Sequence, residues 1–119
     1  MTAAPAPCNL IVTIVNKGRA DEVIQAAKAA GAQGGTIIPG RGSGDRRNPR
    51  LFGIVIEPEK DIVLTLIETA RTPAVLRAIT DALGLEQPGA GIAFVLSVSQ
   101  SVGIAFARQD EPGGTPQKG

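Results

Sequence analysis

Three runs of continuously apolar, mostly β-branched residues constrain the fold of this chain more than any other feature. They cover Leu10–Val15, Ile62–Ile67 and Ile92–Val98. A run without polar alternation is typical of a strand that is buried on both faces. The sequence has helical patterns at only two places, and two helices cannot cover both faces of such a sheet. We therefore expect self-association to cover the remaining face.

The two helical segments lie between these runs and have recognisable ends. The first runs from Arg19 to Ala30, with Gly31 as its stop. The second starts at Thr72-Pro73, a cap residue followed by proline at the first helical position, and ends at Gly84. Each helix has one apolar stripe, formed by Val23, Ile24 and Ala27 in the first and by Val75, Leu76, Ile79 and Leu83 in the second.

Thr36–Ile38 starts a further strand, and Phe52–Ile56 has strand character that Pro58 interrupts before the run Ile62–Ile67. Counting that interrupted segment once, the order is β-α-β-(loop)-β-α-β. This order predicts an α+β, ferredoxin-like fold, in which an antiparallel sheet carries both helices on one face and a long loop follows the second strand. We expect the domain to cover residues 9–106. The flanking residues 1–8 and 107–119 are rich in proline, glycine and small or polar residues, and we expect them to be disordered.

The chain contains no histidine, tyrosine or tryptophan, and its single cysteine is Cys8. Without histidine, sites of the Ser-His-Asp and Cys-His classes cannot form, and a zinc site would lack ligands. We therefore expect no enzyme, no metal site and no obligatory cofactor. The net charge of +1 predicts no nucleic-acid partner. With neither a secretory signal nor an apolar run of about 20 residues, the protein is expected to be cytoplasmic.

Positive charge is concentrated in the segment Arg41–Arg50, which carries four arginines and Asp45 and so a net charge of +3. It contains no aromatic residue that could stack on a nucleic-acid base. We interpret it as a mobile loop that contacts a partner protein through its arginines, within the longer loop region 40–60. These arginines are Arg41, Arg46, Arg47 and Arg50.

Two further motifs each allow a functional and a structural interpretation. Gly89-Ala90-Gly91 could form a nest of backbone N–H groups for a phosphate, or only a helix-to-strand turn that needs glycine. Glu57, Glu59 and Asp61 could chelate a hard cation, but solvated charges near a bend are the better interpretation.

Several motifs, taken in their order along the chain, resemble those of the P-II nitrogen-regulatory signal proteins over about Leu10 to Ala105. The likeness rests on Ala20–Val23, Gly31–Thr36, Gly40–Gly44, Pro58 before a buried strand, and Pro88–Val95. The resemblance implies a homotrimer with adenine-nucleotide sites between subunits, and a loop that regulates a partner such as an enzyme or a membrane transporter. The nucleotide-binding residues that it implies here are Gly40, Gly42, Ser43, Gly89, Ala90 and Gly91.

The sequence departs from the family where phosphates are usually bound. Ala90 stands where a lysine is usual, Ser43 and Gly44 stand where arginine and glutamine are usual, and Val102–Ala105 lacks the usual arginines. We therefore expect AMP, ADP or cyclic AMP to bind in preference to ATP. Two alternatives remain: a structural trimer that has lost its nucleotide, and a small acyl-phosphate hydrolase whose phosphate loop would be Asn16–Arg19.

Overall fold

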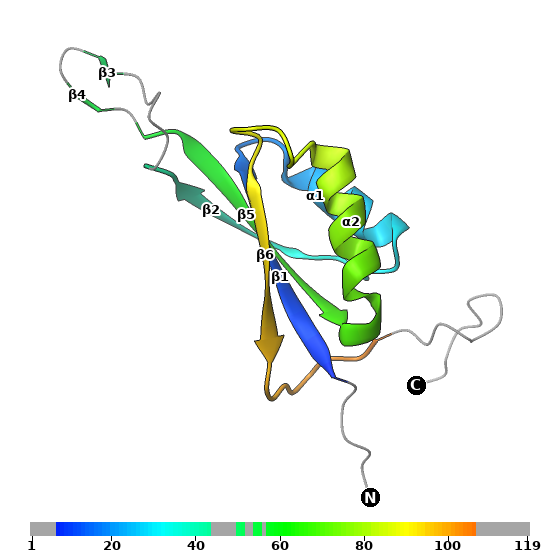
Figure 1. The fold of residues 1–119 in the computed structure, drawn as a ribbon. Coiled ribbons are helices and arrows are strands. Elements are labelled where there is room, and N and C mark those ends of the chain that lie inside the picture. Colours follow the sequence, from blue (N-terminus) through cyan, green and yellow to red (C-terminus); the bar gives the residue numbers. More distant parts are fainter. Residues whose placement is uncertain (1–6, 44–49, 52–53, 56, 107–119) are drawn as a thin grey trace, which may run out of the picture.

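The structure is a computed structural model that describes residues 7–43, 50–51, 54–55 and 57–106 (Figure 1). The expected βαββαβ order is present, and a short two-stranded hairpin lies inside the long loop. In chain order the elements are β1 (Cys8–Asn16), α1 (Ala20–Ala29), β2 (Thr36–Arg41), β3 (Arg50–Leu51), β4 (Ile54–Val55), β5 (Glu59–Glu68), the 3-10 turn η1 (Thr69–Arg71), α2 (Thr72–Leu83) and β6 (Ile92–Val98).

The main sheet has the strand order β2-β5-β1-β6, and every neighbouring pair in it is antiparallel. Both helices lie on one face of this sheet (Figure 1). The first strand of the chain therefore lies in the middle of the sheet, paired with β5 on one side and with β6 on the other. These features confirm the α+β, ferredoxin-like fold that the sequence predicts.

The core lies between the helices and the two central strands. Ile11 and Val15 from β1 and Val63 from β5 are fully buried there, and Val23 and Ile79 cover them from the two helices. Thr13 and Thr65 are also fully buried on this face, and their hydroxyl groups have no hydrogen-bond partner among the described residues. The core is thus almost wholly aliphatic, with two unsatisfied hydroxyl groups inside it.

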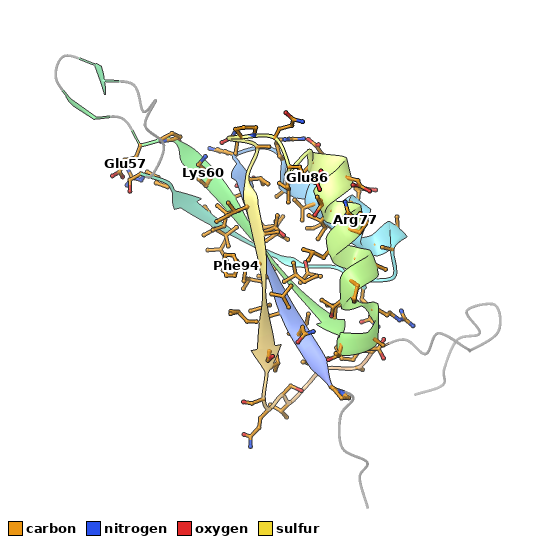
Figure 2. All side chains as sticks on the ribbon, viewed as in Figure 1. Glu57, Lys60, Arg77, Glu86 and Phe94 are labelled. Atoms are coloured by element: carbon orange, nitrogen blue, oxygen red, sulfur yellow. The ribbon has the colours of Figure 1, made fainter. Side chains whose placement is uncertain are left out.

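No helix of the described residues lies over the other face of the sheet, and we call it the open face. Because side chains alternate along a strand, the residues between the core positions of β1 point to this face. Their partners across the ladder are apolar too: Val12 pairs with Leu64 and Phe94, and Ile14 pairs with Ile62 and Ile92. On β6, Ile92 is 54% exposed, Phe94 42% and Leu96 49% (Phe94 is labelled in Figure 2). An apolar surface of this kind is typical of an interaction face.

Some boundaries differ from those expected. Cys8, which we expected in the disordered start, is the first residue of β1 and is buried. β2 continues through Pro39 and Gly40 to Arg41, because it is an edge strand on which the missing N–H of proline costs no ladder bond. Thr72 does not cap α2: its hydroxyl donates to the carbonyl of Glu68 (2.9 Å), and no side chain caps the helix start.

Several expectations fall on residues outside the described ranges. They are the disorder of residues 1–6 and 107–119, and the mobility of the central part of the arginine loop, residues 44–49. Within the described ranges, no helix is both long and apolar enough to span a bilayer.

Candidate functional site

The base of the long loop is formed by the end of β2 and the beginning of β5. Gly40 pairs with Lys60, and the N–H of Gly42 donates to the carbonyl of Pro58 (3.0 Å). A Cβ on Gly42 would lie 2.9 Å from Cε of Lys60, so the lysine side chain crosses this backbone closely and would have to shift for a larger residue. Of the residues expected here, Gly40 and Gly42 therefore lie beside Lys60, and Ser43 follows them, exposed, at the start of the loop.

Lys60 is a residue that was not predicted from the sequence. Its Nζ donates to Oδ1 of Asn16 (2.7 Å), which is its partner residue on β1. Alternation places both side chains on the open face, at the end from which the loop leaves (Figure 2). Asn16 is neutral, so this contact does not neutralise the ammonium group. No local signal marks this role, because Lys60 stands in a run of charges that is typical of a solvated bend.

Two of the acidic residues near Lys60, Glu59 and Asp61, have partners within the chain, and Glu57 is exposed. Glu59 forms an ion pair with Lys17 (2.7 Å), and the hydrogen bond from Lys17 lowers the pKa of Glu59 while Glu59 raises the pKa of Lys17. Asp61 accepts the N–H of Gly18 (2.9 Å). The described residues contain no group of three or more residues that could hold a metal ion. The carboxylates of Glu59 and Asp61 therefore already have partners within the chain.

The turn after β1 does not have the free donors of a phosphate-binding loop. The N–H of Lys17 donates to the carbonyl of Glu59 (3.2 Å), that of Gly18 to Asp61, and that of Arg19 to the carbonyl of Asn16 (3.2 Å). The Arg19 guanidinium binds both carboxylate oxygens of Glu22. This geometry argues against the acyl-phosphate hydrolase alternative, which needs these N–H groups and this arginine for substrate.

The glycine turn between α2 and β6 lies at the same end of the sheet as Lys60. Gly91 has φ +143°, and a Cβ on it would lie 2.7 Å from the carbonyl oxygen of Ile14. Close packing against β1 therefore accounts for Gly91 without a ligand. The N–H of Ala90 donates to the carbonyl of Gln87 (3.2 Å), so the expected nest loses its central donor. Gly89, with φ +79°, remains exposed on the turn.

A groove that was not predicted from the sequence lies on the open face, toward its other end. It has a volume of about 750 Å³ and an apolar floor formed by Leu10, Leu64 and Leu66. One wall is Gln33–Thr36, and the other is Gly103–Phe106. The two walls are far apart in sequence and carry no charged side chain, so no local motif marks them. These surroundings suit an uncharged heterocycle. Its ring would lie on the apolar floor, and its polar atoms would meet the side-chain amide and hydroxyl of the first wall and the backbone groups of both walls.

The loop base and the groove are separated along the sheet. Thr36 pairs with Leu64 and Gly40 pairs with Lys60, which places them four residues apart on β5. At about 3.3 Å per residue, this separation is roughly 13 Å. Within one copy of the chain, the cationic end and the groove are therefore separate features of the same face, which we call the two candidate half-sites.

The arginines proposed to contact a partner lie in and around the long loop. Arg41 ends β2 and is exposed, and Arg50 is in β3, opposite Val55. Arg46 and Arg47 lie outside the described residues. A hollow of about 340 Å³ lies beside the loop base, lined by Pro39, Gly40, Arg41 and Glu59.

Comparisons with known proteins agree with this architecture. The family profile described as "Nitrogen regulatory protein P-II" matches residues 8–111. A structure of Arabidopsis thaliana PII bound to citrate superposes with a TM-score of 0.61 at 21% identity, and the match covers 80% of this chain and 78% of that one.

A Bacillus cereus protein related to NIF3 superposes with a TM-score of 0.62 at 22% identity. That match covers 83% of this chain but only 27% of the longer Bacillus protein. No curated protein sequence matches the chain significantly.

Proposed function

The chain belongs to the nitrogen regulatory protein P-II family, and from this premise we propose that it is a trimeric sensor of an adenine nucleotide. Members of this family are regulatory signal proteins rather than enzymes. In our proposal, the nucleotide binds in the cleft between two subunits. The loop then reports the bound state to a regulated partner, an enzyme or a membrane transporter, in nitrogen metabolism.

The observation that carries this proposal is the division of the open face into two half-sites. The groove offers an apolar floor and hydrogen-bonding groups but no charged side chain, which suits a base. Lys60, whose hydrogen-bond partner among the described residues is the neutral Asn16, suits a phosphate. The two half-sites lie farther apart than the base and phosphate of one mononucleotide. Packing of two open faces would bring the groove of one copy to the loop base of the next.

The six residues that the family resemblance implies stay in the proposed site, but they do not bind phosphate in the way expected from the sequence. They are Gly40, Gly42, Ser43, Gly89, Ala90 and Gly91. Because the N–H groups of Gly42 and Ala90 already have acceptors in the chain, we assign the main attraction for phosphate to Lys60. The glycines then act by letting the ligand and the lysine side chain approach the backbone closely. With Lys60 as the cation that the described residues place at this site, AMP, ADP or cyclic AMP should bind more tightly than ATP.

Calorimetric titration tests this proposal. The probes are AMP, ADP, ATP, cyclic AMP and uncharged adenosine, and citrate serves as an anion without a base. We expect AMP to bind more tightly than adenosine, citrate and ATP. Tighter binding of ATP than of AMP would contradict the assignment of the phosphate site.

Replacing the cation tests the phosphate half-site directly. Lys60→Met should weaken AMP binding by at least about tenfold, because a charge-assisted hydrogen bond contributes about 1.5–3 kcal/mol. Adenosine binding should change little. Lys28→Met, at the exposed end of α1, is the matched control and should leave both affinities unchanged. Equal loss of AMP and adenosine binding would show that Lys60 does not act on the phosphate.

One observation favours the alternative of a structural or interaction trimer without a nucleotide. The hydrogen bond from Ala90 to Gln87 removes a donor that a phosphate would use. This alternative predicts a stable trimer in light scattering that gives no heat with any of the six probes.

A further inference from the structure

The wall of the groove formed by the segment between α1 and β2 has few internal constraints. Three of its five residues from Gly31 to Gly35 are glycines, which gives the backbone high conformational freedom. Ala32 anchors the middle: it is 7% exposed, and its N–H donates to the carbonyl of Ala27 (2.9 Å). Gln33 and Gly35, by contrast, are exposed. The position of this wall therefore depends on what holds its two ends.

The end next to β2 is held by the sheet. A Cβ on Gly35 would lie 3.1 Å from the carbonyl oxygen of Leu64, so this backbone packs closely on the strand that forms the floor. Thr36 then continues as β2 and pairs with Leu64. The spacing between wall and floor is thus fixed at this end by backbone contact.

At the end next to α1, the N–H of Gly31 donates to the carbonyl of Lys28 (3.1 Å), and Arg71 binds the carbonyl of Gly31. Arg71 closes η1, directly after β5, and its side chain is 14% exposed. Its Nη1 donates to the carbonyl of Gly31 (3.2 Å), and its Nε forms an ion pair with Glu68 (3.1 Å). A Cβ on Gly31 would lie 3.3 Å from Nη1, so the guanidinium packs directly on this turn. The planar, multidentate guanidinium can hold both contacts in one fixed geometry.

We infer that Arg71 is a positioning residue of the ligand groove. It ties the end of the floor strand β5 to Gly31, two residues before the wall, and thereby sets how far Gln33 and Gly34 stand from Leu64 and Leu66. The role in ligand binding rests on the proposed function, whereas the role in ordering the wall does not. Arg71 is not a lining residue of the groove, so its effect on a ligand is indirect.

Two measurements on the full-length chain separate these roles. Backbone ¹⁵N order parameters, recorded without ligand, report the rigidity of Gln33–Gly35. In the native protein they should be near the value for rigid backbone, about 0.85, and in Arg71→Ala they should fall toward about 0.6. Titration with AMP should show affinity about five- to tenfold weaker in Arg71→Ala, which corresponds to the loss of one hydrogen bond.

Three further variants isolate the contact with Gly31. Arg71→Lys keeps a donor for the Gly31 carbonyl and should recover most of the affinity. Glu68→Gln removes the ion pair but leaves that donor, so it should lower stability with little effect on the wall. Arg77→Ala is the matched control, because this arginine is 64% exposed on α2 and pairs only with Asp81 and Glu86 within the described residues. It should change neither measurement.

Unchanged order parameters in Arg71→Ala would overturn the inference. So would AMP affinity that falls in Glu68→Gln as much as in Arg71→Ala, since that result would follow from stability alone. If Arg71→Ala does not fold, Arg71→Met decides the same question, because it keeps an extended side chain but has no donor for the Gly31 carbonyl. A native protein that binds none of the probes would refute the proposed function, and the order parameters would still test the position of the wall.

Discussion

Thr13 and Thr65 place hydroxyl groups in an aliphatic core where no described group accepts or donates a hydrogen bond to them. An unsatisfied buried polar group costs about 1–3 kcal/mol. Thr13→Val keeps the β-branched shape and removes the hydroxyl, so we expect it to raise the free energy of unfolding by about 1 kcal/mol. Urea denaturation at a fixed protein concentration measures this change.

Thr72→Val is the control for this prediction. The Thr72 hydroxyl donates to Glu68 and accepts from Nδ2 of Asn9 (3.0 Å). Its removal leaves two partners without their hydrogen bond, and we expect a loss of about 1–2 kcal/mol. The two threonines should therefore respond in opposite directions, and destabilisation by Thr13→Val would contradict the account of the core.

The ion pair between Lys17 and Glu59 has a defined pH dependence. The pKa of Glu59 is lowered in the folded chain, so the stability that its carboxylate contributes is present above the unfolded-state pKa and is lost as the pH falls through the folded-state pKa. Lys17→Met should raise the pKa of Glu59, which ¹³C NMR titration of the carboxyl group would show. Lys28→Met should not. The effect on stability should be small because both side chains are exposed.

At the scale of the elements, the connection from α2 to β6 contains two glycines that are needed for different reasons. Gly84 avoids conformational strain, and Gly91 also allows close packing. Gly84 ends α2 with φ +68°, and the space that a Cβ would occupy there is open, so Gly84→Ala should cost about 1 kcal/mol from strain alone. In Gly91→Ala the new Cβ would also meet the Ile14 carbonyl. We expect a loss of about 3 kcal/mol, in the range for strain combined with overpacking. Thermal unfolding of the two variants compares these costs, and equal losses would refute the packing argument.

The elements were the part of the fold that the sequence predicted best. The limits of β6 and the stop at Gly84 follow from local signals, an unbroken apolar run and a glycine in the left-handed region. The extension of β2 through Pro39 was not predictable locally, since it depends on β2 being an edge strand. The capping of α2 by Thr72 was predicted wrongly, because Glu68 offered its hydroxyl a competing acceptor.

The candidate site was less predictable than the elements, for a physical reason. Glycines mark positions of close approach, so Gly42 and Gly91 were found, although each proved to pack against the chain itself. Lys60 and the groove were missed because strand register creates them. Lys60 meets Asn16 only when β5 pairs with β1, and the floor forms only when Leu10 lies beside Leu66.

For the whole molecule, the exposed apolar residues of the open face make assembly testable. Leu96→Lys places a charge where a trimer would bury the side chain, and burial of an unpaired charge is strongly unfavourable. We expect light scattering to give the mass of a trimer for the native protein and of a monomer for this variant. Val102→Lys is the control, since Val102 is 96% exposed and lies outside β6. A native monomer at micromolar concentration would contradict the trimer.

The strand order also determines when the open face can form while the chain is being synthesised. β1 is the first strand to be made and β6 the last, yet Cys8 pairs with Val98 and Ile14 with Ile92. One side of β1 therefore has no partner until translation has passed β6, and pairing across such a long separation is slow. Because β6 also supplies a large part of the open face, nascent chains halted before Ile92 should remain unassembled. Subunits can then meet only after the sheet of each has closed.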